Sequence, residues 1–549
     1  MNRIKNNKYL IMFIMSLCLV FMVIILLHSY YNLNDLTMAP SENWGRTTSL
    51  VTTELYKKQP SILVNDKYTD ILTANKSNFT TIKIDRQTRE VSYEILNIKG
   101  VESYKVQQFE WDTKNIYFIE DNNLYFATKN PSGGYSAKVK IADDVNDFDI
   151  LEMEGMAAIT ASTKNGIALY RQDKATFVQA GEIYNISNLD SISSVLDNKG
   201  IIHVAAYAET NSVEFPIYYL TFTQDKWAML GTKIEKSLSA SWGINNIDIG
   251  IDDTDVYIFY EMVKWDQYGL STKTYYSVAP LYSGNVDISF NRMFLTKEDE
   301  FNQMFFLNEP NTIKTQSNEL KLSVVKDSYD KKYSNGFSSY IVTMDNGQIK
   351  DFTRATLNQR LVTHTAYADY QGDDILVYLD AAGGFNYEAF YTETGKDYVL
   401  NAAKPTRDDY QVALMNTIPG YVSTFILIII KFTIYFPAIL WFMMIEFFEI
   451  RSLRERPRLS YSIGFLIYLA VKMISFGTYY TPLSISQMPI ILNFTGAKYI
   501  YAVGIAFLAV LIQKLLKKHD PEINLILEYI IFALIDIQIT NLLFATYLV

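Results

Sequence analysis

The chain combines two hydrophobic patterns: long apolar runs near both ends and short alternating runs between them. Residues 9–28, YLIMFIMSLCLVFMVIILLH, form an almost uncharged run of the length that a transmembrane helix needs. The basic residues Arg3, Lys5 and Lys8 precede this run, and no small-x-small cleavage site ends it. The pattern therefore predicts a cytoplasmic N-terminus at 1–8 and an uncleaved signal-anchor helix.

Four further apolar runs lie near the C-terminus, and each is close to a spanning length. Their ranges are 420–447, 460–480, 497–514 and 523–546. Basic residues gather in two of the connecting segments, namely Arg451, Arg454, Arg456, Arg458, Lys514, Lys517 and Lys518. Positive charge favours the cytoplasmic side, so both segments and the N-terminus are expected there. Five crossings then place residues 30–418 and the C-terminus outside the cytoplasm, in a multi-pass protein of the cell membrane.

The central range 45–410, between linkers at 29–44 and 411–419, is expected to be all-β. One unit recurs in it: an apolar strand, a polar turn, then a strand rich in Tyr, Phe or Ile. Seven such hairpins begin near Thr69, Ile116, Met156, Ile201, Val256, Leu320 and Ile375, at spacings of 40 to 64 residues. Such spacing suits a β-propeller of about seven four-stranded blades, with each hairpin as the inner pair of strands. Two tandem β-sandwiches are the alternative.

Charge separates the central range from the ends. Residues 45–410 contain 36 basic and 50 acidic side chains, a net charge of −14, which argues against nucleic acid as a partner. The single cysteine, Cys18, lies in the first apolar run, so the extracytoplasmic domain is expected to fold without disulfides. No WD, kelch or Asp-box signature is present to indicate a propeller family.

Candidate catalytic and metal-binding motifs are scarce. The chain has only four histidines and lacks zinc-binding and GxSxG patterns. Acidic clusters at 143–149 and 252–255 lack the spacing of a calcium loop and suit ordinary turns. We therefore predict no catalytic, cofactor-binding or metal-binding residues. The Tyr-rich and Phe-rich domain is better suited to recognition of a partner.

Ionisable residues within the apolar runs form the most specific signal. Glu528 and Asp536 lie in the last run, whereas Lys431 and Lys472 lie in the second and third. Helical rise places Lys431, Lys472 and Asp536 about 15 to 20 Å into their spans, close to the midplane of the bilayer. We expect an intramembrane charge network of these four side chains, which either holds the helices in register or lines a transport path.

The predicted function is that of a membrane-anchored binding or assembly protein of the cell envelope. Its propeller would recognise an envelope or secreted partner, and its four C-terminal helices would dock a membrane partner within the lipid bilayer. The lysine-, asparagine- and isoleucine-rich composition indicates a bacterial source. A transporter or permease component that uses the intramembrane Lys, Glu and Asp side chains is one alternative, and an extracytoplasmic hydrolase is a second.

Overall fold

A computed structural model of the chain divides into two compact units. The first combines Met1–Met38 with Lys404–Val549, and the second is Ala39–Ala403. The structure describes the whole chain except residues 1, 56–57, 76–77, 103–104, 131–133, 154, 175, 211–212, 237–241, 267–268, 285, 290, 297–303, 315, 331–332, 358–361, 384–385, 435, 449, 482–483, 486–487, 521–522 and 548–549.

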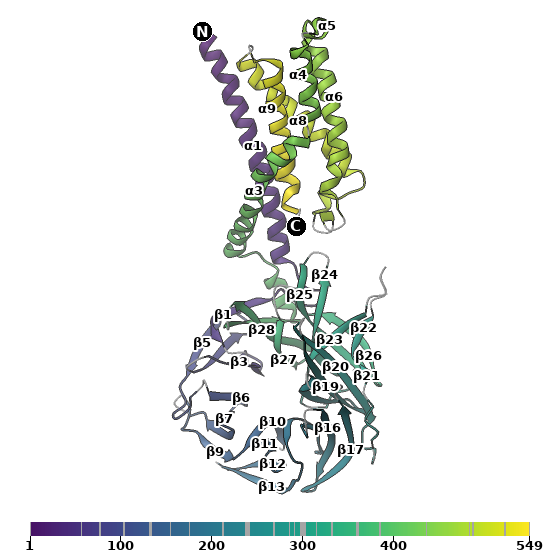
Figure 1. Cartoon of the computed structure of the whole chain (residues 1–549). Helices are drawn as coiled ribbons and strands as arrows, with labels where there is room; N and C mark the ends of the chain where they lie inside the picture. The colour runs from purple at the N-terminus through teal and green to yellow at the C-terminus, as the bar shows by residue number, and fades with distance from the viewer. Residues whose placement is uncertain are drawn as a thin grey trace. The chain divides into compact units, whose positions relative to one another are not determined.

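The second unit is a seven-bladed β-propeller of antiparallel sheets arranged in a ring (Figure 1). The first blade consists of β2 (Ser61–Val64), β3 (Tyr68–Ala74), β4 (Phe79–Asp85) and β5 (Val91–Leu96). The second consists of β6 (Val106–Trp111), β7 (Asn115–Glu120), β8 (Asn123–Thr128) and β9 (Val139–Ala142). The third consists of β10 (Val145–Met153), β11 (Met156–Thr163), β12 (Gly166–Asp173) and β13 (Thr176–Tyr184). The fourth blade consists of β14 (Leu189–Leu196), β15 (Ile202–Ala208), β16 (Glu214–Thr223) and β17 (Lys226–Lys236). The fifth consists of β18 (Trp242–Ile251), β19 (Asp255–Asp266), β20 (Gly269–Pro280) and β21 (Asn291–Arg292).

The last two blades depart from this plan. The sixth has five strands: β22 (Phe294–Thr296), β23 (Met304–Thr312), β24 (Leu320–Asp330), β25 (Tyr333–Asp345) and β26 (Gln348–Arg354). The seventh takes three strands from the end of the domain and one from its beginning: β27 (Val362–Tyr370), β28 (Asp373–Gly383), β29 (Asn386–Glu393) and β1 (Thr48–Leu55). Because β1 pairs with β29, the two ends of the domain close the ring with backbone hydrogen bonds.

Alternating apolar residues on both faces of the blades explain how the ring packs. In the described part of the chain, seven buried hydrophobic clusters each join one pair of neighbouring blades. Phe118 and Phe79 contribute to one of them, and Trp44 to another. Each blade therefore covers the apolar face of the next, which stabilises a ring in which no blade has a core of its own.

Acidic turns between first and second strands recur in several blades. Asp112 accepts a hydrogen bond from the backbone of Asn115 at 2.7 Å and from the Tyr117 hydroxyl at 2.7 Å. Asp252 does the same with the backbone of Asp255 at 2.7 Å and the Tyr257 hydroxyl at 2.6 Å. An aspartate at the start of a turn, with a tyrosine five residues later, is thus a repeated structural element of this propeller.

The seven predicted hairpins are confirmed: six are the second and third strands of their blades, and the hairpin at Leu320 is β24 and β25, the third and fourth strands of the five-stranded sixth blade. The tandem-sandwich alternative is wrong, because each hairpin pairs within its own small sheet. The propeller unit begins at Ala39 and ends at Ala403, slightly earlier at both ends than the expected 45–410. Its last element is the short helix α2 (Lys396–Ala402), whose Tyr398 packs into the core between the seventh and first blades.

The first unit is helical. Its elements are α1 (Asn2–Thr37), α3 (Arg407–Ile434), α4 (Phe436–Phe447), α5 (Arg451–Arg454), α6 (Pro457–Ser475), η2 (Phe476–Tyr479), η3 (Ile490–Leu492), α8 (Ala497–His519), α9 (Leu525–Phe544) and η4 (Ala545–Tyr547). Helix α1 lies against α3 and α8, and α9 packs against α3 and α8 (Figure 1). Tyr468, Tyr529 and Phe532 form the aromatic centre of the core.

Four helical stretches in the described part of the chain are long and apolar enough to cross a membrane. They are Lys8–Thr37, Pro457–Tyr479, Ala497–His519 and Leu525–Tyr547. The expected second span, 420–447, is helical on both sides of residue 435, which lies outside the described residues: α3 covers it up to Ile434 and α4 covers Phe436–Phe447.

The helices also extend beyond the expected spans. The expected linkers are partly helical, since α1 continues to Thr37 and α3 starts at Arg407.

Candidate functional site

One strand of each blade, the first in six blades and β23 in the sixth, lines a central cavity. Its volume is about 500 Å³, and residues of β2, β6, β10, β14, β18, β23 and β27 line it. Most lining side chains are polar, so the cavity is the principal concentration of hydrogen-bonding groups described here. We therefore take this central channel as the candidate functional site.

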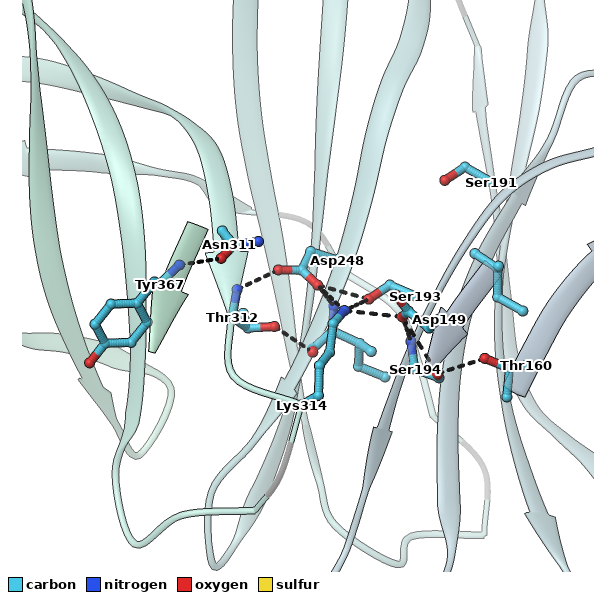
Figure 2. A network of polar contacts seen from close by, with 12 residues as sticks. Asp149, Thr160, Ser191, Ser193, Ser194, Asp248, Asn311, Thr312, Lys314 and Tyr367 are labelled. Carbon is cyan, nitrogen blue, oxygen red and sulfur yellow. Dashed lines mark hydrogen bonds and ion pairs between the residues drawn. The ribbon is translucent and has the colours of Figure 1, made fainter. Parts of the chain in front are cut away.

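Lys314 lies at the centre of the polar network in the channel (Figure 2). Its Nζ lies 3.0 Å from Asp149 Oδ2 of β10, 2.9 Å from Ser193 Oγ of β14 and 3.3 Å from Asp248 Oδ1 of β18. Lys314 itself follows β23, so one ammonium group joins four consecutive blades. Burial lowers the pKa of Lys314, but Asp149, Asp248 and Glu110 together raise it above the usual lysine range.

The two carboxylates that bind Lys314 also connect neighbouring inner strands. The backbone N–H of Ser194 donates to Asp149 Oδ2 at 2.6 Å, and the backbone N–H of Thr312 donates to Asp248 Oδ2 at 2.7 Å. Asp248 Oδ1 also accepts a 2.7 Å hydrogen bond from Ser193 Oγ. These groups supply hydrogen bonds between blades, where no β-ladder exists, and they engage both oxygens of Asp248 and the Oδ2 oxygen of Asp149.

Two other carboxyl groups, those of Glu110 and Asp147, line the same cavity. The backbone N–H of Ile150 donates to Glu110 Oε2 at 3.2 Å, and that of Ile192 donates to Asp147 Oδ2 at 3.0 Å. Burial and the nearby charge of Asp149 raise the pKa of Glu110 well above its usual value. Burial raises the pKa of Asp147 to about 6. Both groups therefore hold a proton at higher pH than an exposed carboxyl does.

Amide and basic side chains complete the lining. Gln59, Gln107, Asn245 and His364 contribute donors and acceptors, and Lys58 donates from Nζ to the backbone carbonyl of Gln107 at 2.6 Å. Burial lowers the pKa of Lys58. The lining thus carries four carboxyl groups against two lysines, a balance that suits neutral or cationic polar ligands better than anions.

The acidic clusters considered in the sequence divide between turns and the channel. Asp252 and Asp255 belong to a turn held by hydrogen bonds within it, and Asp143 forms an ion pair with Lys140. Asp147 and Asp149 point into the network just described. Among the described residues, no three His, Cys, Asp or Glu side chains are grouped as metal ligands.

In the helical unit, the structure brings two of the four predicted intramembrane residues together. Lys472 Nζ lies 2.6 Å from Asp536 Oδ1, and both side chains are fully buried. The Tyr468 hydroxyl donates to the other oxygen, Asp536 Oδ2. The charged pair is thus enclosed by protein and aromatic rings rather than by an open path.

The other two predicted residues have different partners. Glu528 forms an ion pair with Lys517, which the sequence had indicated as a cytoplasmic charge. Lys431 is buried and donates from Nζ to Thr478 Oγ1 at 2.7 Å. The long lysine side chain of α8 reaches the first turn of α9, which explains why depth along each span did not identify this pair.

The remaining basic residues lie at helix ends. Arg451 begins α5 and pairs with Glu455 at 2.9 Å on an exposed surface. Arg456 and Arg458 flank the first residue of α6, and Arg454 ends α5. Lys514, Lys517 and Lys518 belong to the last turns of α8, and the Lys518 ammonium lies 5.7 Å from the ring centre of Tyr9 in α1. The basic end of α8 therefore lies beside the beginning of α1.

Sequence analysis did not identify the channel residues. Asp149 and Asp248 each stand in an apolar strand, within the segments DFDIL and NIDIG, where an acid is unexpected. An acidic residue inside an apolar first strand, present in β10 and again in β18, was the available signal. Lys314 carried no such signal, because its partners are 66 and 165 residues away in the chain.

Comparisons with known proteins assign no family. No protein-family model and no curated protein match the chain. The solved structures that resemble it include polysaccharide lyase Uly1, at 9% identity over 66% of this chain and 94% of that one, with a TM-score of 0.38. The β-propeller domain of the Trilobed protease from Pyrococcus furiosus is 9% identical over 63% and 95%, with a TM-score of 0.34. A thermostable family-43 glycoside hydrolase is 12% identical over 58% and 98%, with a TM-score of 0.28. Similarity this low transfers no activity to the chain.

Proposed function

We propose that the chain is a membrane-anchored protein of the cell envelope whose propeller recognises an envelope or secreted partner through its central channel. In this proposal, the helical unit lies in the lipid bilayer and docks a second membrane protein. The observation that carries the proposal is the cavity of about 500 Å³, to which the inner strands of all seven blades contribute polar side chains. A site assembled from every blade is rigid, which favours recognition with little loss of conformational entropy.

The chemistry of the channel limits what the partner presents. Asp149 and Asp248 already bind Lys314 and the backbone of neighbouring blades. Glu110 and the lining amides are the groups best placed to contact a ligand, because they offer both donors and acceptors. A partner with a hydroxyl-rich or cationic group would fit this lining, and an anionic group would be repelled by the excess of carboxyl groups.

The surface of the helical unit supports a position in lipid. Large apolar side chains are strongly exposed along its helices, including Ile474 at 82% and Met15 at 66% of full exposure. In α1 the exposed apolar residues recur every three or four positions, at Ile11, Met15, Leu19, Met22 and Leu26. Such continuous apolar faces are costly in water and suit contact with lipid chains.

Polar contacts within the helical unit support retention of α1. His28 Nε2 lies 2.9 Å from the backbone carbonyl of Leu542, and Nδ1 lies 2.9 Å from the Tyr547 hydroxyl. Asn32 Nδ2 donates to Thr417 Oγ1 at 2.9 Å. Cleavage and loss of α1 would remove these hydrogen bonds, so the contacts favour a permanent anchor.

Binding measurements on the full-length protein test the proposal. The purified chain, immobilised in detergent, would be exposed to soluble and solubilised envelope material, with captured components quantified by mass spectrometry. Glu110→Gln with Asn245→Leu should lower capture of a specific component at least about tenfold, because both change the open lining. Asp225→Asn, in the turn between β16 and β17, is the control. Equal capture by the channel variant and the control would contradict recognition by the channel.

A hydrolase remains the second candidate, because the channel contains one carboxyl group that stays protonated to high pH and another that is ionised at neutral pH. Glu110 holds its proton to unusually high pH, as a general acid must, and Asp147 with a pKa of about 6 is ionised at neutral pH. Incubation with envelope polysaccharide, followed by an assay for new reducing ends, would test this candidate. Wild-type activity that Glu110→Gln abolishes would establish the hydrolase. Absence of activity in the wild-type protein would rule out this candidate.

A further inference from the structure

Two lysines of the helical unit converge on the short η2 turn, at the end of α6. Lys431 of α3 is 7% exposed, and its Nζ donates to Thr478 Oγ1 at 2.7 Å. Lys498 of α8 approaches the neighbouring residue: its Nζ would lie 3.3 Å from a Cβ atom added to Gly477. Ammonium groups from two different helices therefore lie beside two consecutive residues of one turn.

Neither ammonium group is neutralised within the described part of the chain. No described carboxylate lies within 4 Å of Lys431 or Lys498, whereas Lys472 and Lys517 each pair with a carboxylate of α9. Aromatic rings take part of the space around them: Tyr479 lies 4.3 Å from Lys431 Nζ, and Tyr499 lies 5.5 Å from Lys498 Nζ. A buried ammonium has three donors, and one hydroxyl together with a ring face does not replace its hydration.

The surrounding residues indicate the depth of this site. Tyr479 donates to Asn541 Oδ1 at 2.5 Å, and Asn541 donates to the Thr424 carbonyl at 3.3 Å. His28, which ends the apolar run of α1, binds the carbonyl of Leu542, one residue further along α9. The η2 turn therefore lies at the level where the apolar part of α1 ends, opposite the basic end of α8. Tyrosine-rich levels of this kind match the boundary between the hydrocarbon core and the headgroups, so in this placement the Lys431 ammonium group lies nearer the headgroups than the midplane that helical rise indicated.

We propose that the η2 turn, with Lys431 and Lys498, binds the phosphate of a phospholipid headgroup in the outer leaflet. This rests on the proposed position of the helical unit in lipid. A phosphate supplies several anionic acceptor oxygens, enough for both ammonium groups. The Thr478 hydroxyl, exposed at the surface, accepts from Lys431 and donates to the Ser475 carbonyl at 2.9 Å, which positions the Lys431 ammonium group at the turn. Gly477 keeps the space beside Lys498 open, because a side chain at this position would crowd the ammonium group. Basic sites between transmembrane helices commonly bind lipid headgroups in this way.

Retention of anionic lipid by the purified full-length protein tests the site. The protein would be exchanged into nanodiscs of phosphatidylcholine with 20% phosphatidylglycerol, about one lipid in five, and the retained phosphatidylglycerol would be counted by native mass spectrometry after ejection. Lys498→Met and Lys431→Met should each lower retention about fivefold, and Lys431→Arg should preserve it. Lys514→Met, which removes one charge at the other end of α8, is the matched control and should change nothing.

The outcomes separate this site from the proposed function. Equal retention by wild-type, Lys431→Met and Lys498→Met protein would overturn the lipid site while leaving the membrane position intact. Displacement of the lipid by millimolar inorganic phosphate would identify a soluble anion site instead and would also overturn it. A co-purified protein bound through a carboxylate at these lysines would do the same. Full recovery of the chain from cells without detergent would instead contradict the proposed membrane position.

Discussion

The propeller and the helical unit both bury charged side chains, but they neutralise them in opposite ways. In the propeller, Asp149 and Asp248 each bind a backbone N–H group of an adjacent blade as well as Lys314. Each carboxylate therefore has several partners, and each partner stabilises it only modestly. In the helical unit, Asp536 has Lys472 and the Tyr468 hydroxyl, all fully or almost fully buried. Helical backbone N–H groups are already bonded within the helix, so only side chains remain to neutralise a buried charge.

This difference predicts where a lost charge costs most. Channel carboxylates keep their backbone partners and contact with the cavity when a lysine is removed. A helix-buried lysine or aspartate has no such substitute, because its surroundings are apolar. The two regions should therefore respond unequally to the same type of substitution.

The largest effect is expected at the buried pair of the helical unit. Asp536→Asn leaves the Lys472 ammonium without a counter-charge and should destabilise the unit by about 3 to 5 kcal/mol. Membrane abundance and thermal unfolding in detergent would measure the loss. The double variant Lys472→Met with Asp536→Leu removes both charges and should recover most of it.

The same variants distinguish a structural pair from a transport path. Asp536→Asn that abolishes ion or proton flux in proteoliposomes, while abundance and thermal stability stay at wild-type values, would contradict the structural interpretation and favour the transport alternative.

The second effect concerns a buried carboxyl group of the propeller and depends on pH. Burial and the neighbouring Glu309 raise the pKa of Glu261 to about 7. The unfolded chain loses this proton near pH 4.5, so the folded state becomes less stable as pH rises from about 4.5 to 7. The loss amounts to about 3 kcal/mol above pH 7. Glu261→Gln should abolish this pH dependence and stabilise the propeller at pH 8.

Tryptophan fluorescence can follow that change, because five of the six tryptophans lie between residues 39 and 403. Melting curves of wild-type and Glu261→Gln protein at pH 5 and pH 8 provide the comparison. Curves that shift equally with pH in both proteins would show that Glu261 is not responsible.

A smaller effect is expected at Lys314. Lys314→Met removes the cation shared by Asp149 and Asp248, but both carboxylates retain their backbone donors and their contact with the cavity. We expect a destabilisation of about 2 kcal/mol. Lys321→Met is the matched control: it also removes a partly exposed lysine that pairs with two aspartates, but one that does not line the channel. A Lys314 effect no larger than the Lys321 effect would argue against a central role for the ammonium group.

The smallest effect is expected at the surface of the helical unit. Arg451 and Glu455 form an ion pair whose side chains are 90% and 64% exposed. Arg451→Ala should change thermal stability by no more than about 0.5 kcal/mol, because water screens the pair. A loss similar to that of Asp536→Asn would show that exposure does not determine the cost of losing a charge in this unit.

Sequence patterns predicted the propeller well because each blade is local. A hairpin such as that beginning at Val256 pairs residues close in the chain, and its alternation and turn are readable from a short window. The closing pair of β1 and β29 could not be read in this way, because its partners lie more than 300 residues apart.

The candidate site was less predictable for the same reason. The channel brings together Glu110, Asp149, Asp248 and Lys314 from four blades, and only the closed ring determines that they meet. In the helices, spacing along each span indicated the depth of Lys472 and Asp536, which do meet. The spacing did not account for the length of the lysine side chains. That length allows Lys517 to bind Glu528 and Lys431 to extend to Thr478.

The central claim is that lipid separates the propeller from the cytoplasm, and cysteine labelling on intact cells tests it most directly. Cys18→Ser provides a background without cysteine, since the chain has only one. Single substitutions Lys226→Cys, in the propeller, and Arg451→Cys, at the start of α5, would then be treated with a membrane-impermeant maleimide. We predict labelling of the propeller cysteine in intact cells and of the Arg451→Cys variant only after the cells are opened. Labelling of Arg451→Cys but not Lys226→Cys in intact cells would contradict the account.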